Sequence, residues 1–309
     1  MQAVVASKLV KFYGKNKNKV QALFDVSFEV GRGELFGIIG PDGAGKTSLF
    51  RILTTLLLPD GGTAMVNELD IVKDFKAIRR IVGYMPGKFS LYQDLSVREN
   101  LDFFATIFNT SITENYEMVK EIYLQIEPFQ DRKAGKLSGG MKQKLALSCA
   151  LIHRPAILFL DEPTTGVDAV SRKEFWDMLK NLQKQGITII VSTPYMDEAS
   201  LCDRVALMQS GKILKINTPS GIREQFGKPL YAVRGNRMFP ILNALKNYEA
   251  VEDVYPFGDR HHVIMKDVTH GENELRAFLE PFSNDHLLIT SEQPDIEDCF
   301  MALMKNQHE

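Results

Sequence analysis

The stretch Gly40-Pro41-Asp42-Gly43-Ala44-Gly45-Lys46-Thr47 fits the pattern GxxxxGK[ST], which is typical of a loop that binds phosphate. The apolar run Leu35–Ile39 precedes it, and apolar residues at helical spacing follow it over residues 48–58. A strand, a glycine-rich turn and a helix in this order are the context that such a loop requires. Free N–H groups at the helix start favour an anion, and glycines let the backbone approach it closely. A chance match in an ordinary glycine turn is the alternative.

Two side chains of this stretch suit a nucleoside triphosphate. Lys46 is expected to reach the β- and γ-phosphates, and Thr47 to offer its hydroxyl to Mg²⁺. The sequence therefore predicts a site for a nucleotide and its metal ion.

A second element of this chemistry is predicted near residue 160. The continuous apolar run at residues 157–160 is typical of a parallel strand that is buried on both faces. It ends in Asp161 and Glu162, and two adjacent carboxylates are costly to bury there unless a cation or hydrogen-bond donors meet them. With a phosphate loop in the same chain, we expect Asp161 to hold Mg²⁺ or its water and Glu162 to act as general base. A solvent-exposed turn or helix start is the alternative.

Composition limits the class of protein. The chain has 309 residues, 44% of them hydrophobic, which is enough for one large domain or two of ordinary size. Its 37 Lys and Arg against 39 Asp and Glu give a net charge of −2, so a nucleic-acid partner is disfavoured. Three distant cysteines, Cys149, Cys202 and Cys299, suit reduced thiols in a cytosolic protein. No apolar run approaches the 18 residues that span a bilayer, and the N-terminus does not resemble a signal peptide. Work at a membrane would therefore need a partner.

The pattern along the chain predicts an α/β protein of two domains. Residues 3–38 are expected to form strands, and residues 96–152 change to helical spacing, which suggests a helical insertion. Beyond Pro219 the expected order is strand, helix, strand, strand, helix, strand, which is typical of a small two-layer α+β domain with antiparallel pairing. We therefore predict domains at residues 1–220 and 221–309, with a helical subdomain at about residues 88–152.

Three weaker signals leave alternatives open. Tyr13, just before a turn, could stack on a purine, although exposed tyrosines in turns are common. The segment Leu137-Ser138-Gly139-Gly140 opens an amphipathic helix and offers a second anion-binding terminus, although Ser and Gly also begin helices for capping alone. His261 and His262 are expected to point to opposite faces of a strand, which favours a hairpin over a metal site.

Together these segments resemble the nucleotide-binding subunit of an ATP-binding cassette (ABC) transporter over about residues 3–220. The resemblance rests on the phosphate loop, the Leu-Ser-Gly-Gly helix start, the strand ending in Asp-Glu-Pro163 and the following Gly166-Val-Asp168. Gly83-Tyr-Met-Pro86 and Leu137-Ser-Gly-Gly-Met-Lys-Gln143 look like cassettes of ABC-2 type exporters, whose clients are drugs, lipids or polysaccharides. Pro294-Asp-Ile-Glu-Asp-Cys-Phe300 is similar to the motif that ends the small C-terminal domain of many such cassettes.

The resemblance implies a P-loop ABC cassette with a mixed sheet and a helical subdomain, followed by a ferredoxin-like domain. It implies Mg²⁺ and ATP, with Glu162 activating water and with Thr47 and Asp161 at the metal. Two cassettes would dimerise head to tail, so that Ser138, Gly139 and Gly140 of one subunit contact the γ-phosphate bound by the other. Nucleotide contacts are expected from Tyr13, Gly40, Pro41, Asp42, Gly43, Ala44, Gly45, Lys46, Thr47, Ser48 and Asp161. The implied place is the cytoplasmic face of the inner (plasma) membrane, with ABC-2 permease subunits and no nucleic acid as partners.

Two positions depart from the family pattern. Gly87 stands where the family normally has a glutamine that touches Mg²⁺ and the attacking water, and Pro194 stands where it has a histidine that contacts the γ-phosphate. Loss of one transition-state donor costs about 10²- to 10³-fold in rate. We therefore expect ATP to be held and cut slowly, if at all, and a second cassette to supply the competent site. A homodimer with slower hydrolysis, a soluble ABC protein of translation or DNA repair, and a silent ATP-dependent scaffold are the alternatives.

Overall fold

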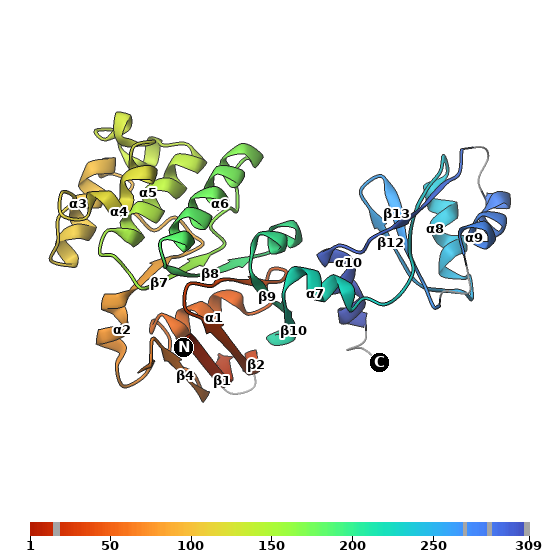
Figure 1. Ribbon diagram of the computed structural model, residues 1–309, viewed down its shortest axis with the longest axis horizontal. Helices are drawn as coiled ribbons and strands as arrows, with labels where there is room; N and C mark the ends of the chain where they lie inside the picture. The colour runs from red at the N-terminus through yellow and green to blue at the C-terminus, as the bar shows by residue number, and fades with distance from the viewer. Residues whose placement is uncertain (15–18, 268–270, 283–285, 306–309) are drawn as a thin grey trace. The chain divides into compact units, whose positions relative to one another are not determined.

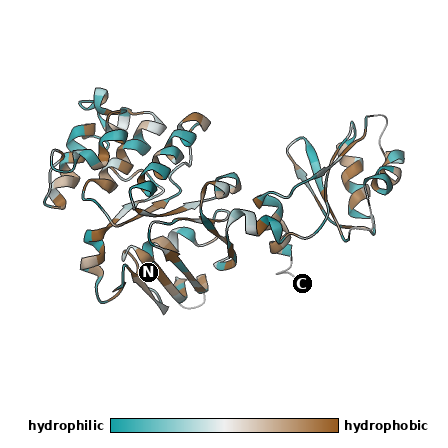
Figure 2. Cartoon of the chain, in the orientation of Figure 1, coloured by the Kyte–Doolittle hydropathy of each residue, from teal (hydrophilic) through white to brown (hydrophobic). Residues whose placement is uncertain are grey.

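The computed structural model describes residues 1–14, 19–267, 271–282 and 286–305 (Figure 1). The chain divides into two compact units, the first ending at Pro219 and the second beginning at Ser220. Each unit has its own buried apolar core, and most of the helices that enclose it carry both hydrophobic and hydrophilic residues (Figure 2). Within the described residues, no helix is both long and apolar enough to cross a bilayer.

The first unit begins with an antiparallel sheet in the order β2-β1-β4-β5. Its strands are β1 (Gln2–Tyr13), β2 (Val20–Gly31), β4 (Gly61–Val66) and β5 (Leu69–Asp70). β1 and β2 have 12 residues each and are much longer than ordinary strands. Tyr13, the last residue of β1, therefore lies beside the phosphate loop described below.

A second sheet of six strands, in the order β10-β9-β3-β8-β7-β6, forms the centre of this unit. It consists of β3 (Leu35–Ile39), β6 (Val82–Met85), β7 (Ile157–Asp161), β8 (Thr188–Thr193), β9 (Arg204–Gln209) and β10 (Lys212–Asn217). Neighbouring strands from β6 to β9 are parallel, and only β10 runs antiparallel. Every residue of β3, β7 and β8 is buried, as the apolar runs at residues 35–39 and 157–160 predict for β3 and β7. The carboxyl ends of the parallel strands therefore meet along one edge of the sheet.

The helices beside this sheet differ from the expected pattern in two places. α1 (Lys46–Leu53) was expected to continue to Leu58, but it ends after two turns, and the side chain of Leu56 is 56% exposed. Thr54 closes α1 because its backbone N–H bonds back to the carbonyls of Phe50 and Ile52. α6 (Ala169–Lys184) was not predicted, although Asp168 caps its first turn by accepting from the Ser171 N–H. A 3₁₀ helix, Met196–Leu201, follows β8, and α2 (Phe75–Ile81) precedes β6.

The helical insertion consists of α3 (Val97–Ile107), α4 (Tyr116–Tyr123) and α5 (Gly139–Leu151), with short 3₁₀ turns at Glu127–Phe129 and Ala134–Lys136. α3 begins with a capping box, in which Ser96 and Glu99 satisfy each other's backbone N–H groups. α4 and α5 are tied together where buried Asn115 donates to the carbonyl of Ile152.

The second unit is a four-stranded antiparallel sheet in the order β12-β13-β11-β14. Its elements are β11 (Leu230–Arg234), α8 (Met238–Lys246), β12 (Val251–Phe257), β13 (Arg260–Met265), α9 (Glu272–Leu279) and β14 (Leu288–Glu292), flanked by α7 (Pro219–Glu224) and α10 (Ile296–Lys305). A short 3₁₀ turn, Glu280–Phe282, extends α9. This order of elements and strands is the ferredoxin-like arrangement.

The two faces of this second sheet are covered by different helices. α8 and α9 cover the face that contains Val233, Val254 and Val263, while α10 packs against Leu230, Tyr255 and Ile264 on the other. The adjacent histidines of β13 separate accordingly. His261 Nε2 bonds to the carbonyl of Met238 at the start of α8, and His262 Nδ1 bonds to Asp298 Oδ1 on α10 at 2.6 Å.

Candidate functional site

The phosphate loop, residues 40–47, joins the end of β3 to the start of α1. Two of its glycines are required by the close approach of other backbone segments. A Cβ at Gly40 would lie 2.1 Å from the carbonyl oxygen of Met208, and one at Gly45 would lie 2.7 Å from that of Ala22. Gly45 also has a φ of 104°, which side-chain-bearing residues rarely adopt. The loop therefore packs closely against the backbones of β2 and β9, which restrict it to one conformation.

Lys46 lies beneath this turn and is only 3% exposed. Its Nζ donates to the carbonyls of Gly40 at 2.8 Å and Pro41 at 3.0 Å, and lies 3.1 Å from Oε1 of Glu162. A buried ammonium needs such partners because desolvation is costly. The ion pair brings the phosphate loop and the Asp161-Glu162 segment together, as the sequence predicts.

The N-terminus of α1 has an unsatisfied set of donors. The N–H groups of a first helical turn have no intrahelical partner, and Gly45 at the N-cap has no side chain that could accept from them. Next to them, the hydroxyls of Ser48 and Tyr13 lie 3.0 Å apart. Tyr13 is 39% exposed and thus keeps part of its ring available beside the loop.

The two acidic residues end β7, and Ser192 on the neighbouring strand β8 orders both. Ser192 Oγ donates to Asp161 Oδ1 at 2.6 Å and accepts from the Glu162 N–H at 3.1 Å, while its carbonyl also accepts from that N–H at 3.0 Å. Asp161 is 2% exposed. Glu162 has a φ of 51°, in the left-handed region. Sequence reasoning missed Ser192, because a single serine near the end of a strand carries no distinctive pattern.

The charge of the Asp161 carboxylate also acts on Tyr84, which lies on β6. Burial and the negative charge of Asp161 raise the pKa of Tyr84 to about 12, against the opposing effect of Arg51. Tyr84 thus remains a neutral hydrogen-bonding group beside the acidic pair at physiological pH, and it too was not predicted from the sequence.

Gly87 and Pro194 both lie at this edge of the sheet. A Cβ at Gly87 would be 3.0 Å from the Asp161 carbonyl oxygen and 3.7 Å from the Glu162 Cβ. Pro194 directly follows Thr193, whose carbonyl accepts from the Gly40 N–H at 3.2 Å. Gly87 therefore adjoins the acidic pair, and Pro194 adjoins the strand end that bonds to the phosphate loop.

A buried glutamate holds the segment after Pro194 in place. Glu198 accepts from Thr193 Oγ1 at 2.5 Å and from Thr164 Oγ1 at 2.8 Å, and Arg172 Nε lies 3.4 Å from its Oε1. The Arg172 guanidinium also covers the Tyr195 ring, 4.5 Å from its centroid. Tyr195 is thus packed against Arg172 of α6.

The Ser138-Gly139-Gly140 segment begins α5. Ser138 caps the helix by accepting from the Met141 N–H at 3.3 Å. A Cβ at Gly140 would meet Ser171 Oγ at 2.7 Å, whereas one at Gly139 would lie 3.4 Å from the Gly166 carbonyl. Ser138, Gly139 and Gly140 therefore lie against α5 itself and against residues 166–171. Among the described residues, none of these contacts is with the phosphate loop.

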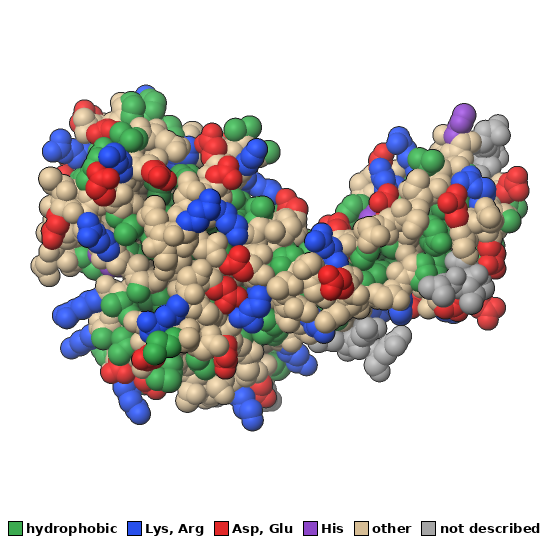
Figure 3. Space-filling model, in the orientation of Figure 1, with side chains coloured by type: hydrophobic (Ala, Val, Ile, Leu, Met, Phe, Trp, Pro, Cys, Tyr) green, Lys and Arg blue, Asp and Glu red, His purple; other side chains and the backbone are tan. Residues whose placement is uncertain are grey.

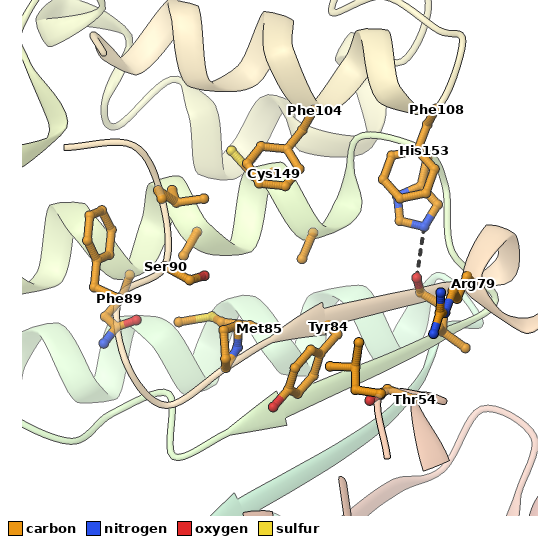
Figure 4. Close-up of a pocket in the computed structure, with 17 residues that line it drawn as sticks. Thr54, Arg79, Tyr84, Met85, Phe89, Ser90, Phe104, Phe108, Cys149 and His153 are labelled. Carbon is orange, nitrogen blue, oxygen red and sulfur yellow. Dashed lines mark hydrogen bonds between the residues drawn. The ribbon is translucent and has the colours of Figure 1, made fainter. Parts of the chain in front are cut away.

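An apolar cavity of about 250 Å³ lies next to Tyr84, between β6 and the helical insertion (Figure 4). Phe104 of α3 and Phe108, directly after that helix, form one side of it, and Met85 and Phe89 lie on the other. The cavity is lined by Thr54, Leu56, Arg79, Val82, Tyr84, Met85, Pro86, Phe89, Ser90, Leu91, Phe104, Phe108, Gln143, Ala146, Cys149, Ala150 and His153. His153 stacks on Phe108, and its Nε2 bonds to the Val82 carbonyl at 3.0 Å, while burial lowers its pKa.

Comparison with known proteins places this geometry in context. The family model described as "ABC transporter" matches residues 23–165. The probable multidrug ABC transporter ATP-binding protein YbhF of Escherichia coli is 37% identical over 300 residues, covering 95% of this chain and 50% of that protein. The chain thus spans half the length of this relative. The daunorubicin resistance ATP-binding protein DrrA2 of Streptomyces coeruleorubidus is 32% identical over 315 residues, covering 99% of this chain and 96% of that protein.

Solved structures give a consistent result. The dimeric ATP-binding cassette MJ0796, in a post-hydrolysis state bound to ADP and Pi, superimposes with a TM-score of 0.64 at 25% identity. The match covers 70% of this chain and 98% of the MJ0796 chain.

Proposed function

The chain belongs to the ABC transporter family, and from this premise we propose that it is the ATP-binding subunit of an exporter, which binds Mg-ATP and works through membrane partner subunits. The observation that carries the proposal is the position of Lys46. Its buried ammonium lies under a glycine-rich turn and beside the open N–H groups of α1. A triphosphate is the kind of ligand that can use both features at once.

The residues of the site fit ATP and Mg²⁺. We assign nucleotide binding to Tyr13, to residues 40–48 and to Asp161, and metal contacts to Thr47 and Asp161. Mg²⁺ would supply charge compensation for the phosphates. Ser192 holds one oxygen of Asp161, which orients that carboxylate before any ligand arrives. Glu162, paired with Lys46 here, is the residue that could receive a proton from water.

Turnover at this site is proposed to be weak. Gly87 offers no side chain to the acidic pair, and Pro194 has neither a polar side chain nor a backbone N–H for the loop. We infer that the chain pairs with a second cassette whose own site is complete, and that this chain's Ser138, Gly139 and Gly140 face the nucleotide held by that partner. The exposed start of α5 is available for such a contact.

We propose that the apolar cavity of Figure 4 binds a segment of an ABC-2 type permease. Phe89, Ser90 and Leu91 line it and lie two to four residues after Gly87, so this segment would connect an inserted side chain with the strand end beside the acidic pair. In this arrangement the subunit is peripheral on the cytoplasmic face of the membrane, and the C-terminal unit is an accessory domain.

Calorimetry with Mg-ATP tests the proposal. Wild-type protein is expected to bind Mg-ATP, and Lys46→Ala to bind it far more weakly, while Lys184→Ala at the exposed end of α6 leaves the affinity unchanged. Equal affinity of the wild type and Lys46→Ala would contradict nucleotide binding at the loop. Hydrolysis is then measured on the purified chain, and substantial Mg²⁺-dependent turnover that Glu162→Gln abolishes would contradict the weak-site proposal alone.

A further inference from the structure

The surface of α2 is basic, although the chain as a whole is slightly acidic. Residues 70–88 contain five basic side chains and two acidic ones, a net charge of +3, while the whole chain has −2. The basic residues are Lys73, Lys76, Arg79, Arg80 and Lys88, and all five are exposed. Lys and Arg side chains project from the surface where Figure 1 draws α2 (Figure 3).

The helix turns these charges to one side. Ile78 is fully buried, and the basic residues Lys76, Arg79 and Arg80 are three and four positions apart, so they share the opposite face. Arg79 anchors this face to the end of α1, because its Nε and one terminal nitrogen donate to the hydroxyl and carbonyl of Thr55.

The remaining cations of this face have no carboxylate partner. Within the described residues, Lys73, Lys76 and Arg80 form no ion pair. The two nearby acids, Asp70 and Asp74, lie beside Lys73 just before α2, where backbone N–H groups engage them. Asp70 accepts from the N–H groups of Val72 and Lys73, which lower its pKa, and Asp74 accepts from the Asp70 N–H.

Exposed aliphatic side chains accompany the cations. Leu56 lines the mouth of the apolar cavity together with Arg79, and Leu58 and Val72 are 64% and 50% exposed. Uncompensated cations beside exposed aliphatic side chains are the composition of a surface that rests on the headgroups of an anionic bilayer.

We propose that this α2 surface, formed by Lys73, Lys76, Arg80, Leu56, Leu58 and Val72, binds the headgroups of anionic phospholipids directly. Charge complementarity selects this occupant: separate, mobile headgroups can each meet one unpaired cation, whereas an acidic protein segment would need a matching arrangement of carboxylates. The aliphatic side chains add apolar contact at the level of the headgroups. This inference goes beyond the proposed function, because it needs neither nucleotide nor permease.

The test is sedimentation of the full chain with vesicles. Wild-type protein is mixed with vesicles of phosphatidylglycerol and phosphatidylcholine, or of phosphatidylcholine alone, at low and high salt. The test variant is Lys73→Glu/Lys76→Glu/Arg80→Glu, which leaves Arg79 in place. The control, Lys184→Glu/Lys212→Glu/Lys246→Glu, makes the same change in net charge at exposed lysines elsewhere. Retained Mg-ATP affinity confirms that both variants are folded.

Binding is expected only with phosphatidylglycerol, and weakens with salt. The test variant should lower the partition coefficient at least about 100-fold, since each basic side chain near such a surface is worth about fivefold, and the control should lower it far less. Absence of binding by the wild type, equal binding to both vesicles, or equal losses in the two variants would overturn the proposal. A test variant that still binds vesicles like the wild type, but no longer co-purifies with its membrane partner, would show that the surface is a protein contact. The lipid assignment would then be wrong.

Discussion

Ser192 Oγ donates to Asp161 Oδ1 at 2.6 Å across two neighbouring parallel strands, and the same oxygen accepts from the Glu162 N–H. One hydroxyl thus fixes the side chain of the first acid and the backbone of the second. Such an arrangement orients a carboxylate before its metal arrives, which is how supporting residues raise the affinity of a site.

Ser192→Ala is expected to weaken Mg-ATP binding by about 10-fold, within the range given for loss of a supporting residue. Binding of ATP in excess EDTA should change little, since the phosphate loop is untouched. Calorimetry in both conditions measures the difference. The matched control is Ser200→Ala, an exposed serine that donates only to the Asp197 carbonyl. Equal losses with and without Mg²⁺ would contradict a role through Asp161.

Pro194→His combined with Gly87→Gln is expected to raise the turnover of the purified chain by about 100-fold or more, by restoring two transition-state donors. Gly87→Gln alone should gain less than the double variant, because Pro194 would still supply no donor next to the phosphate loop. Phosphate release at saturating Mg-ATP is the measurement. A wild-type rate equal to that of the double variant would show that these two positions do not limit hydrolysis.

Gly140→Ala is expected to destabilise the first unit by about 1–3 kcal/mol, because its Cβ would lie 2.7 Å from Ser171 Oγ and 2.9 Å from Ser171 Cβ. Gly139→Ala is the matched control, since its Cβ would lie 3.4 Å from the nearest atom and should change stability far less. The single tryptophan, Trp176, is buried on α6 and reports unfolding of this unit by fluorescence in a denaturant titration. Similar unfolding midpoints for the two variants would contradict the tight packing of Gly140.

Asp298→Ala is expected to destabilise the second unit by about 3 kcal/mol or more, because this fully buried carboxylate accepts from Tyr255, His262 and the Asp295 N–H. Asp259→Ala, at an exposed turn, is the control. Hydrogen exchange of peptides from residues 230–265 measures the loss of protection. An unchanged exchange rate in this sheet would rule out Asp298 as its link to α10.

The stability of the second unit should also fall in acid. Burial by itself would raise the pKa of Asp298, but the hydrogen bonds from His262 and Tyr255 outweigh it and hold that pKa below the ordinary value of 3.8. The stabilisation is therefore complete above about pH 4 and is lost as the pH falls through the lowered pKa. Hydrogen exchange between pH 3 and 5, corrected for intrinsic rates, should show this loss in the wild type and not in Asp298→Ala.

Much of the fold could be predicted from local pattern. The buried strands β3 and β7 coincide with apolar runs, and the elements of the second unit follow their expected order. The predicted ends of the helices were less accurate. α1 ends at Leu53 because its backbone is closed at Thr54, although apolar spacing continues to residue 57. α6 was missed because its charged outer face obscures the apolar stripe that includes Phe175 and Leu179.

By itself, the sequence determined that this chain has a phosphate-binding loop, because the loop is one contiguous stretch whose glycines and lysine act locally. It also indicated the two acids that end a buried strand, Asp161 and Glu162. Only the tertiary structure decided that Ser192 orders both acids, that Glu198 joins the ends of two strands, and that Lys46 pairs with Glu162. These contacts join residues that are far apart in the chain, and parallel strands bring them together only when the sheet has formed its order and register.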